Sequence, residues 1–198
     1  MRLFTILTIS LTAIVISQAQ PARVLNASFE GEPRDATIPR GWYDCEPGTT
    51  PDILPGPWGV YLEASAGETY VGLITRENGS WESIGQKLSK KLEEGICYYF
   101  SLELARSDEY MGYNKPLKLR IWGGDGKCKR TQLLVETERI DHTDWEPYSF
   151  DFTAETDLRY LIVEAYHADG NFAYAGNILI DNISPIRQCG RTMLLPDE

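Results

Sequence analysis

The sequence predicts an all-β fold, a sandwich of two antiparallel sheets held together by disulfides. Short runs rich in β-branched and aromatic residues recur along the chain, most alternate apolar with polar residues, and Gly, Pro and Asp turns separate them. Four cysteines follow an apolar leader, and an even number in an exported chain indicates disulfides. The alternation argues against parallel strands joined by crossover helices, because such strands are buried on both faces.

Residues 1–19 have the pattern of an export signal. Arg2 precedes an apolar run from Leu3 to Ile16, and "SQA" (17–19) supplies small residues for cleavage before Gln20. The run is too short for a comfortable membrane span. We therefore expect an exported protein without a transmembrane segment, in the periplasm, at the outer-membrane surface or outside the cell. The predicted domain covers 20–190, and 191–198 form a C-terminal tail.

The charge excludes one class of partner. The chain has 29 acidic and 19 basic residues, with a net charge of −10. Because no basic cluster is available to neutralise phosphates, we expect no nucleic-acid binding.

Eight runs supply the strands. Before them, residues 31–68 are rich in Pro and Gly, and a loop this long is either functional or held by a staple. Cys45 lies inside this loop, which favours the staple. "SKKLEEG" (89–95) is too short for a helix and predicts a charged turn. The predicted strands are 69–75, 80–89, 96–105, 117–123, 131–140, 147–154, 159–167 and 177–186.

Eight strands with Greek-key connections form a jelly roll. One sheet then holds the first, eighth, third and sixth strands, and the other holds the second, seventh, fourth and fifth. In this order Cys97 begins the third strand, and Cys189 follows the end of its neighbour, the eighth. Cys45 and Cys128 are left to join the long loop to the "GGDGKCKR" turn (123–130). We favour this pairing over the other two, because a disulfide needs Cα atoms within about 7 Å.

Four short motifs carry a family resemblance. They are "NASFE" (26–30), "PRGW" (39–42), "GETY" (67–70) and the terminal "ILIDNIS". Together they resemble jelly-roll carbohydrate-binding modules of the family 4, 9 and 22 type, a branch of the galactose-binding-like folds. The wider pattern also resembles exported modules of Bacteroidota envelope proteins. These motifs specify the fold well and the ligand badly.

The resemblance implies a structural calcium ion. In those modules the first and last strands share the ion, held by the acid after "SF" and by an Asp of the last strand. The matching residues here are Glu30 and Asp181, completed by backbone carbonyls, which suits a cation that takes six to eight oxygens. Asn182 stands where a second Asp is common, so one anionic ligand of the pattern is missing. The alternative is that Glu30 is a solvated acid on an edge strand.

The second predicted sheet forms the concave face of this fold, where sugars would bind. Aromatic rings stack on pyranose faces, and planar polar groups reach the hydroxyls. Alternation turns Leu117, Leu119 and Ile121 inward on one strand, and Leu161, Val163 and Ala165 inward on its neighbour. The side chains left facing outward are Arg120, Trp122, Glu164 and Tyr166. The plainer alternative is an Arg120–Glu164 cross-strand pair flanked by aromatic rings that cover the sheet.

Loops at the rim add aromatic residues that are exposed by position. They suit either a glycan or a protein partner, and aromatic enrichment alone does not separate the two. They are Trp42, Trp58, Tyr61, Tyr110 and Tyr113.

The sequence favours a binding function over catalysis. It contains no Gly-x-Ser-x-Gly, His-Glu-x-x-His or phosphate-loop pattern. We expect a non-catalytic exported binding module, with carbohydrate as the favoured ligand. One alternative is a protein-interaction subunit of a bacterial outer-membrane or cell-envelope assembly of the secretion or gliding type. A weaker alternative is a small polysaccharide-acting enzyme.

Overall fold

The computed structural model describes residues 20–168 and 173–190, so the predicted export signal and the tail (191–198) lie outside the described residues. These residues form two antiparallel sheets. The first sheet has the order β1-β4-β9-β6-β7. Its strands are β1 (Tyr43–Asp44), β4 (Ser83–Leu92), β9 (Leu158–His167), β6 (Lys115–Gly124) and β7 (Gln132–Glu136).

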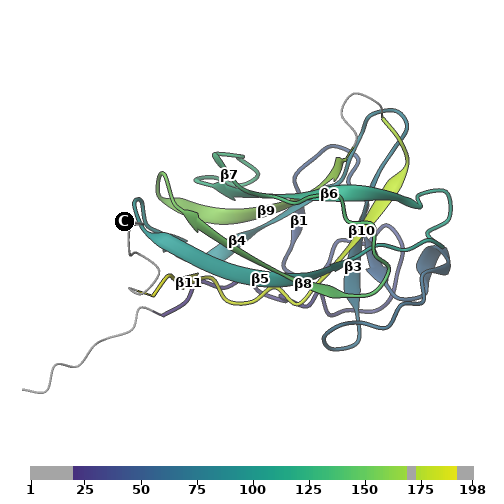
Figure 1. Ribbon diagram of the computed structural model, residues 1–198, viewed down its shortest axis with the longest axis horizontal. Coiled ribbons are helices and arrows are strands. Elements are labelled where there is room, and N and C mark those ends of the chain that lie inside the picture. The colour runs from purple at the N-terminus through teal and green to yellow at the C-terminus, as the bar shows by residue number, and fades with distance from the viewer. Residues whose placement is uncertain (1–19, 169–172, 191–198) are drawn as a thin grey trace, which may run out of the picture.

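The second sheet has the order β2-β3-β10-β5-β8. Short parallel pairing between β10 and β6 joins the two sheets, and Figure 1 shows β6, β7 and β9 in one layer with β5 and β8 in the other. The strands of the second sheet are β2 (Asp52–Leu54), β3 (Tyr70–Thr75), β10 (Gly176–Asp181), β5 (Cys97–Ala105) and β8 (Glu146–Thr153), with β11 (Arg187–Gln188) beside β5.

The predicted jelly roll and its strand order are confirmed, because all eight runs form strands with the expected neighbours. Several boundaries differ. The run at 80–89 begins as β4 at Ser83, and the run at 131–140 ends as β7 at Glu136. β4 continues to Leu92, through part of the expected turn at 89–95. The last run stops at Asp181 because Asn182 takes a left-handed conformation with φ 52°, which interrupts the strand before β11.

The main core lies between the sheets and comes from the inward residues of both. Leu119, Ile121 and Val163 are fully buried against Phe100 and Leu102 of the second sheet. This is the phase that the alternation predicts for β6 and β9. Because successive residues of a strand face opposite sides, the residues between these buried ones point away from the core.

A smaller apolar cluster explains the long loop. The outer side of β3, β5 and β10 carries Ile74, Ala105 and Leu179, and Leu54 and Val60 of the loop cover them. A 3-10 turn, η1 (Pro57–Gly59), lies between these two covering residues. The loop is therefore packed structure, and it builds one rim of the sandwich.

Both disulfides follow the favoured pairing. Cys45 is bonded to Cys128 and Cys97 to Cys189, with Cα atoms 5.0 and 5.4 Å apart. Among the described residues, no helix is long and apolar enough to span a membrane.

The two disulfides should contribute similarly to stability. They join residues 83 and 92 positions apart, and the chain-entropy model gives about 4.6 kcal/mol for loops of this length, while measured losses are commonly about 2–5 kcal/mol. We expect two double variants, Cys45→Ser/Cys128→Ser and Cys97→Ser/Cys189→Ser, each to lower the free energy of unfolding by about 2–5 kcal/mol. Urea unfolding measures it. Either double variant being as stable as the parent would contradict the chain-entropy model.

Candidate functional site

The predicted outward residues of β6 and β9 do share one face. Arg120 lies opposite Glu164, and Trp122 lies opposite Ile162. The same face includes aromatic residues that the sequence analysis missed. We call the set Tyr43, Trp81, Trp122, Tyr160 and Tyr166 the aromatic face. Trp81 and Tyr160 could have been found by extending the two-residue alternation beyond the strand centres.

The Arg120–Glu164 ion pair, which the sequence offered as the plainer alternative to a sugar site, does not form. Arg120 instead donates from Nε to Glu136 of β7 at 2.6 Å. Its guanidinium also lies over the ring of Tyr166, 3.3 Å from the centroid. Arg120 has a carboxylate opposite it on each neighbouring strand, and Glu164 has another partner. The hydrogen bond from Arg120 lowers the pKa of Glu136.

Glu164 is buried under a loop that crosses the face. Arg130, from the β6–β7 connection, donates to Glu164 at 2.7 Å and to Glu46 at 3.0 Å. Glu46 follows Cys45, so the Arg130–Glu46 ion pair and the Cys45–Cys128 disulfide hold the same two loops together, while the Arg130–Glu164 pair ties one of these loops to β9. One end of the face is therefore closed and the adjacent rings are held in place.

Gly85 permits this closure by close approach. A Cβ at Gly85 would lie 2.7 Å from the sulfur of Cys45 and 3.0 Å from the ring of Tyr43. Any side chain on this position of β4 would push the disulfide loop off the sheet.

Among the described residues, four buried polar side-chain atoms on the side of the sheet that carries the aromatic face have no hydrogen-bond partner: Tyr43 Oη, Trp81 Nε1, Ser83 Oγ and Trp122 Nε1. A fifth such atom, His167 Nε2, lies on β9 opposite the buried Leu117 and so belongs to the other side of the sheet. Burial, with a smaller contribution from Tyr160, raises the pKa of Tyr43 to about 12, so its hydroxyl stays protonated. Buried polar groups in proteins are nearly always paired, so these four atoms can take hydrogen bonds from a partner outside the chain.

The aromatic rings contact one another at an edge of this cluster. Trp81 meets Tyr166 edge-to-face with centroids 6.0 Å apart, while Arg120 covers one side of Tyr166. Trp122 is half-buried on the neighbouring strand. The arrangement combines ring surfaces, a guanidinium and unpaired donors on adjacent strands, which are the groups that bind hydroxylated rings.

Two rim residues are buried, which corrects the expectation that all five rim aromatics are exposed. Trp42 is 6% exposed and stacks on Phe29, with centroids 5.0 Å apart. Tyr110 is 1% exposed and donates its hydroxyl to Asp52. Both lie in loops that fold back over apolar surface, and sequence position alone does not show what covers a loop residue.

The other three rim aromatics differ in exposure. Trp58 and Tyr61 are exposed, at 41% and 73%. Tyr113 is half-buried and contacts the ring of Tyr110 edge-to-face at 6.3 Å. Only Trp58 and Tyr61 of the rim set therefore offer broad ring surface to a partner.

Glu30 and Asp181 come together at the turn formed by residues 65–68. The Glu68 amide donates to the Glu30 carboxylate at 3.2 Å. The Ala66 amide donates to Asp181 at 2.8 Å, and the Asn182 amide donates to its other oxygen at 2.7 Å. The two chain ends thus meet through two carboxylates that face one turn.

The local backbone is shaped to hold these two carboxylates. Asn26 accepts a hydrogen bond from the Glu30 amide at 2.7 Å and donates to the Glu30 carbonyl at 3.0 Å. Asn26, Phe29 and Asn182 all have φ between 52° and 54°, which is uncommon outside glycine. Burial is the main cause that raises the pKa of Asp181 to about 6, and the charge of Glu30 adds to it. A cation would relieve both effects, so two hard oxygen donors held here suit calcium.

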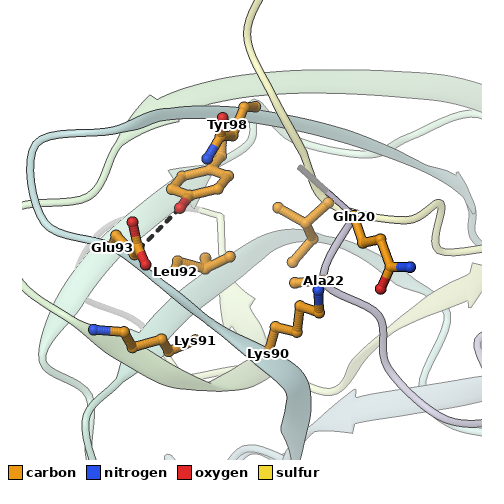
Figure 2. A pocket seen from close by; sticks show the side chains of 9 residues that line it. Gln20, Ala22, Lys90, Lys91, Leu92, Glu93 and Tyr98 are labelled. Carbon is orange, nitrogen blue, oxygen red and sulfur yellow. Dashed lines mark hydrogen bonds between the residues drawn. The ribbon is translucent and has the colours of Figure 1, made fainter. Parts of the chain in front are cut away.

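A separate hollow of about 210 Å³ lies where residues 20–22 pass the β4–β5 hairpin, and Figure 2 shows its lining. Lys90 and Lys91 lie at its edge, and Lys91 pairs with Asp157 at 2.6 Å. The Tyr98 hydroxyl inside it accepts a hydrogen bond from the Glu93 amide at 2.9 Å. Lys91 and Tyr98 are therefore engaged within the chain.

The fold is similar to solved carbohydrate-binding modules. The CBM22-1 xylan-binding domain from Paenibacillus barcinonensis Xyn10C is 16% identical over 87% of this chain and 97% of that chain, with a TM-score of 0.53. The CBM22-1 and GH10 modules of a Clostridium thermocellum xylanase, complexed with xylohexaose, are 13% identical over 90% of this chain and 30% of that chain, with a TM-score of 0.52.

An adhesin domain has the same fold. The K3 cleaved adhesin domain of Lys-gingipain from Porphyromonas gingivalis is 14% identical over 83% of this chain and 98% of that chain, with a TM-score of 0.52. No family model matches the sequence, and no curated protein matches it. At these identities the similarities show the fold, and they confirm the predicted resemblance to jelly-roll carbohydrate-binding modules at that level.

The raised pKa of Asp181 predicts a pH-dependent contribution to stability. The folded state binds this proton more tightly than the unfolded state, whose pKa is near 3.8, so the contribution is full below pH 3.8 and is lost as the pH rises through about 6. With chelator present, we expect the stability difference between the parent and Asp181→Asn to fall by at most about 2 kcal/mol between about pH 4 and 7. Urea unfolding at several pH values measures it.

Asp157→Asn is the matched control. Asp157 is on the surface, and its hydrogen bond from Lys91 lowers its pKa, so the sign is opposite and its contribution is lost as the pH falls. A stability difference for Asp181→Asn that does not change with pH would show that Asp181 is ionised throughout this range.

Proposed function

We propose that this protein is a non-catalytic carbohydrate-binding module whose aromatic face binds a glycan chain. The observation that carries the proposal is the group of four buried, unpartnered polar atoms among the rings on this side of the sheet. A sugar chain supplies apolar ring faces for stacking and hydroxyl oxygens for hydrogen bonds in the same molecule.

The closed end of the face limits how a chain would lie. The Cys45–Cys128 disulfide and Arg130 occupy one end, while Trp81 and Tyr166 lie toward the other. A glycan therefore runs across Trp122 and Tyr166, with Arg120 donating to its hydroxyls. Rings that packing already holds in place lose little conformational freedom when a ligand stacks on them.

The fold neighbours support this assignment as analogy. Two of them are named for xylan binding or for a complex with xylohexaose, and a shared fold does not fix the ligand. The protein functions outside the cytoplasm in this proposal, because its two disulfides need an oxidising compartment.

We also propose that calcium binds Glu30 and Asp181. The carboxylates would supply two anionic ligands and backbone carbonyls the others, and the ion would tie the first described segment to the last long strand. The ion has a structural role here and no part in sugar chemistry.

Glycan binding predicts specific losses on the aromatic face. Trp122→Ala and Tyr166→Ala should each weaken binding by about 2 kcal/mol or more, which is roughly thirtyfold, because each removes a stacking surface. Trp122→Phe keeps a ring but removes the unpaired N–H, so we expect an intermediate loss. Affinity electrophoresis in gels containing xylan or other soluble polysaccharides measures these changes.

Tyr99→Ala is the control, because Tyr99 is 42% exposed on β5 of the opposite sheet. It should bind like the parent. A parent protein that binds none of the polysaccharides but retains an envelope protein in a pull-down, and loses that protein in Trp122→Ala, would contradict glycan binding and favour the envelope-assembly alternative.

Calcium binding predicts sensitivity to chelator. Adding EDTA should lower the melting temperature, because an ion that binds only the folded state contributes about 2.7 kcal/mol at a hundredfold excess over its dissociation constant. Asp181→Asn should lose this sensitivity, and Asp157→Asn should retain it. Equal melting with calcium and with EDTA would rule out the ion.

A further inference from the structure

A second candidate site lies at the rim, on the long loop, away from the aromatic face. A hollow of about 410 Å³ is lined by Pro33, Arg34, Asp35, Pro57 and Trp58. Its volume falls at the lower end of the range for small-ligand pockets, about 300–1,000 Å³. The indole of Trp58 and two prolines give it an apolar surface, and Arg34 and Asp35 place opposite charges beside that surface.

Trp58 is held in a conformation that a bulky residue rarely adopts. Its φ and ψ are 56° and 16°, and Gly56 and Gly59 on either side have φ of 116° and 80°. The carbonyl of Trp58 accepts a hydrogen bond from the Met111 amide at 3.2 Å. Such strain persists only where the surroundings impose it, and it is concentrated at ligand clamps.

A smaller hollow of about 80 Å³ also borders Trp58. Ala36, Asp52 and Arg76 contribute to its lining. Ala36 is also left-handed, with φ 46°, and its amide donates to the buried carboxyl of Asp52 at 2.7 Å. Two of the strained non-glycine residues therefore line one hollow.

The charge that Arg76 brings to the smaller hollow is compensated by Glu82. Glu82 is fully buried and accepts hydrogen bonds from Arg76 at 2.6 Å, from the Thr50 amide at 2.9 Å and from the Ile74 amide at 3.1 Å. Burial raises the pKa of Asp52, which favours its neutral form. With Arg34 beside Asp35 and Arg76 paired with Glu82, the rim favours an uncharged ligand.

We propose that Trp58, Arg34 and Asp35 form a second binding site for one uncharged sugar unit, such as the end of a glycan chain. The ring would stack on the indole of Trp58, and the guanidinium and carboxylate would reach its hydroxyls. This site stands on its own geometry and does not depend on glycan binding at the aromatic face.

Nuclear magnetic resonance of the indole N–H groups tests the proposal. The protein has five tryptophans, and the signal missing from Trp58→Asn identifies Trp58. Asparagine is chosen because it tolerates the left-handed backbone. The probes are the methyl glycosides of glucose, galactose, mannose, xylose and arabinose, titrated to about 10 mM, since one sugar ring is expected to bind with a dissociation constant of about 1 mM.

We expect at least one glycoside to shift the Trp58 signal in a saturable way. Arg34→Gln should weaken that binding at least fivefold, and Trp58→Asn should abolish every backbone shift at the rim. Tyr61→Ala, which removes a more exposed rim aromatic outside both hollows, should bind like the parent. Trp122→Ala should also leave the rim shifts unchanged, which separates this site from the aromatic face. A Trp58 signal that no glycoside moves, or rim shifts that survive in Trp58→Asn, would overturn the proposal.

Discussion

The pairing of β6 with β9 is the constraint on which both the core and the candidate binding face depend. In the observed register Ile121 lies opposite Val163, and Arg120 lies opposite Glu164. Successive residues of a strand face opposite sides, so a slip of one residue between these strands would place charged side chains in the core. The burial of Leu119, Ile121 and Val163 therefore fixes the outward position of Arg120 and Trp122.

The outward face is organised by competition among ion pairs. Arg120 could reach a carboxylate on either side, but Arg130 descends from the β6–β7 connection to hold Glu164, which leaves Glu136 for Arg120. This choice places the Arg120 guanidinium over Tyr166. The Cys45–Cys128 disulfide keeps the loop that carries Arg130 in place, so a covalent link helps to set the geometry of a noncovalent face.

The strained backbone positions lie where segments distant in the sequence pack against one another. Among residues 20–168 and 173–190, the non-glycine residues with left-handed φ fall into three groups: Asn26, Phe29 and Asn182 near Glu30 and Asp181, Ala36 and Trp58 at the rim hollows, and Cys128 in a disulfide. Each group lies where distant segments of the chain meet. The packing that joins those segments offsets the local cost of the conformation.

Local patterns were enough to predict the strands, their phase and, with the Greek-key rule, their order. Alternation is a local property, and the predicted order placed Cys97 beside Cys189, which left Cys45 to pair with Cys128. The family motifs near both ends of the domain also indicated that Glu30 and Asp181 meet. Which outward residues are covered, and which partners they take, depends on the tertiary structure. The sequence places Trp42 and Tyr110 in rim loops, where exposure is expected. In the structure, Trp42 is buried against Phe29, and Tyr110 is buried with its hydroxyl donated to Asp52. Arg120 lies opposite a carboxylate on each neighbouring strand. Because Arg130 binds Glu164, Arg120 pairs with Glu136. Burial and ion pairing depend on what a distant segment places above a side chain, and no local pattern encodes that.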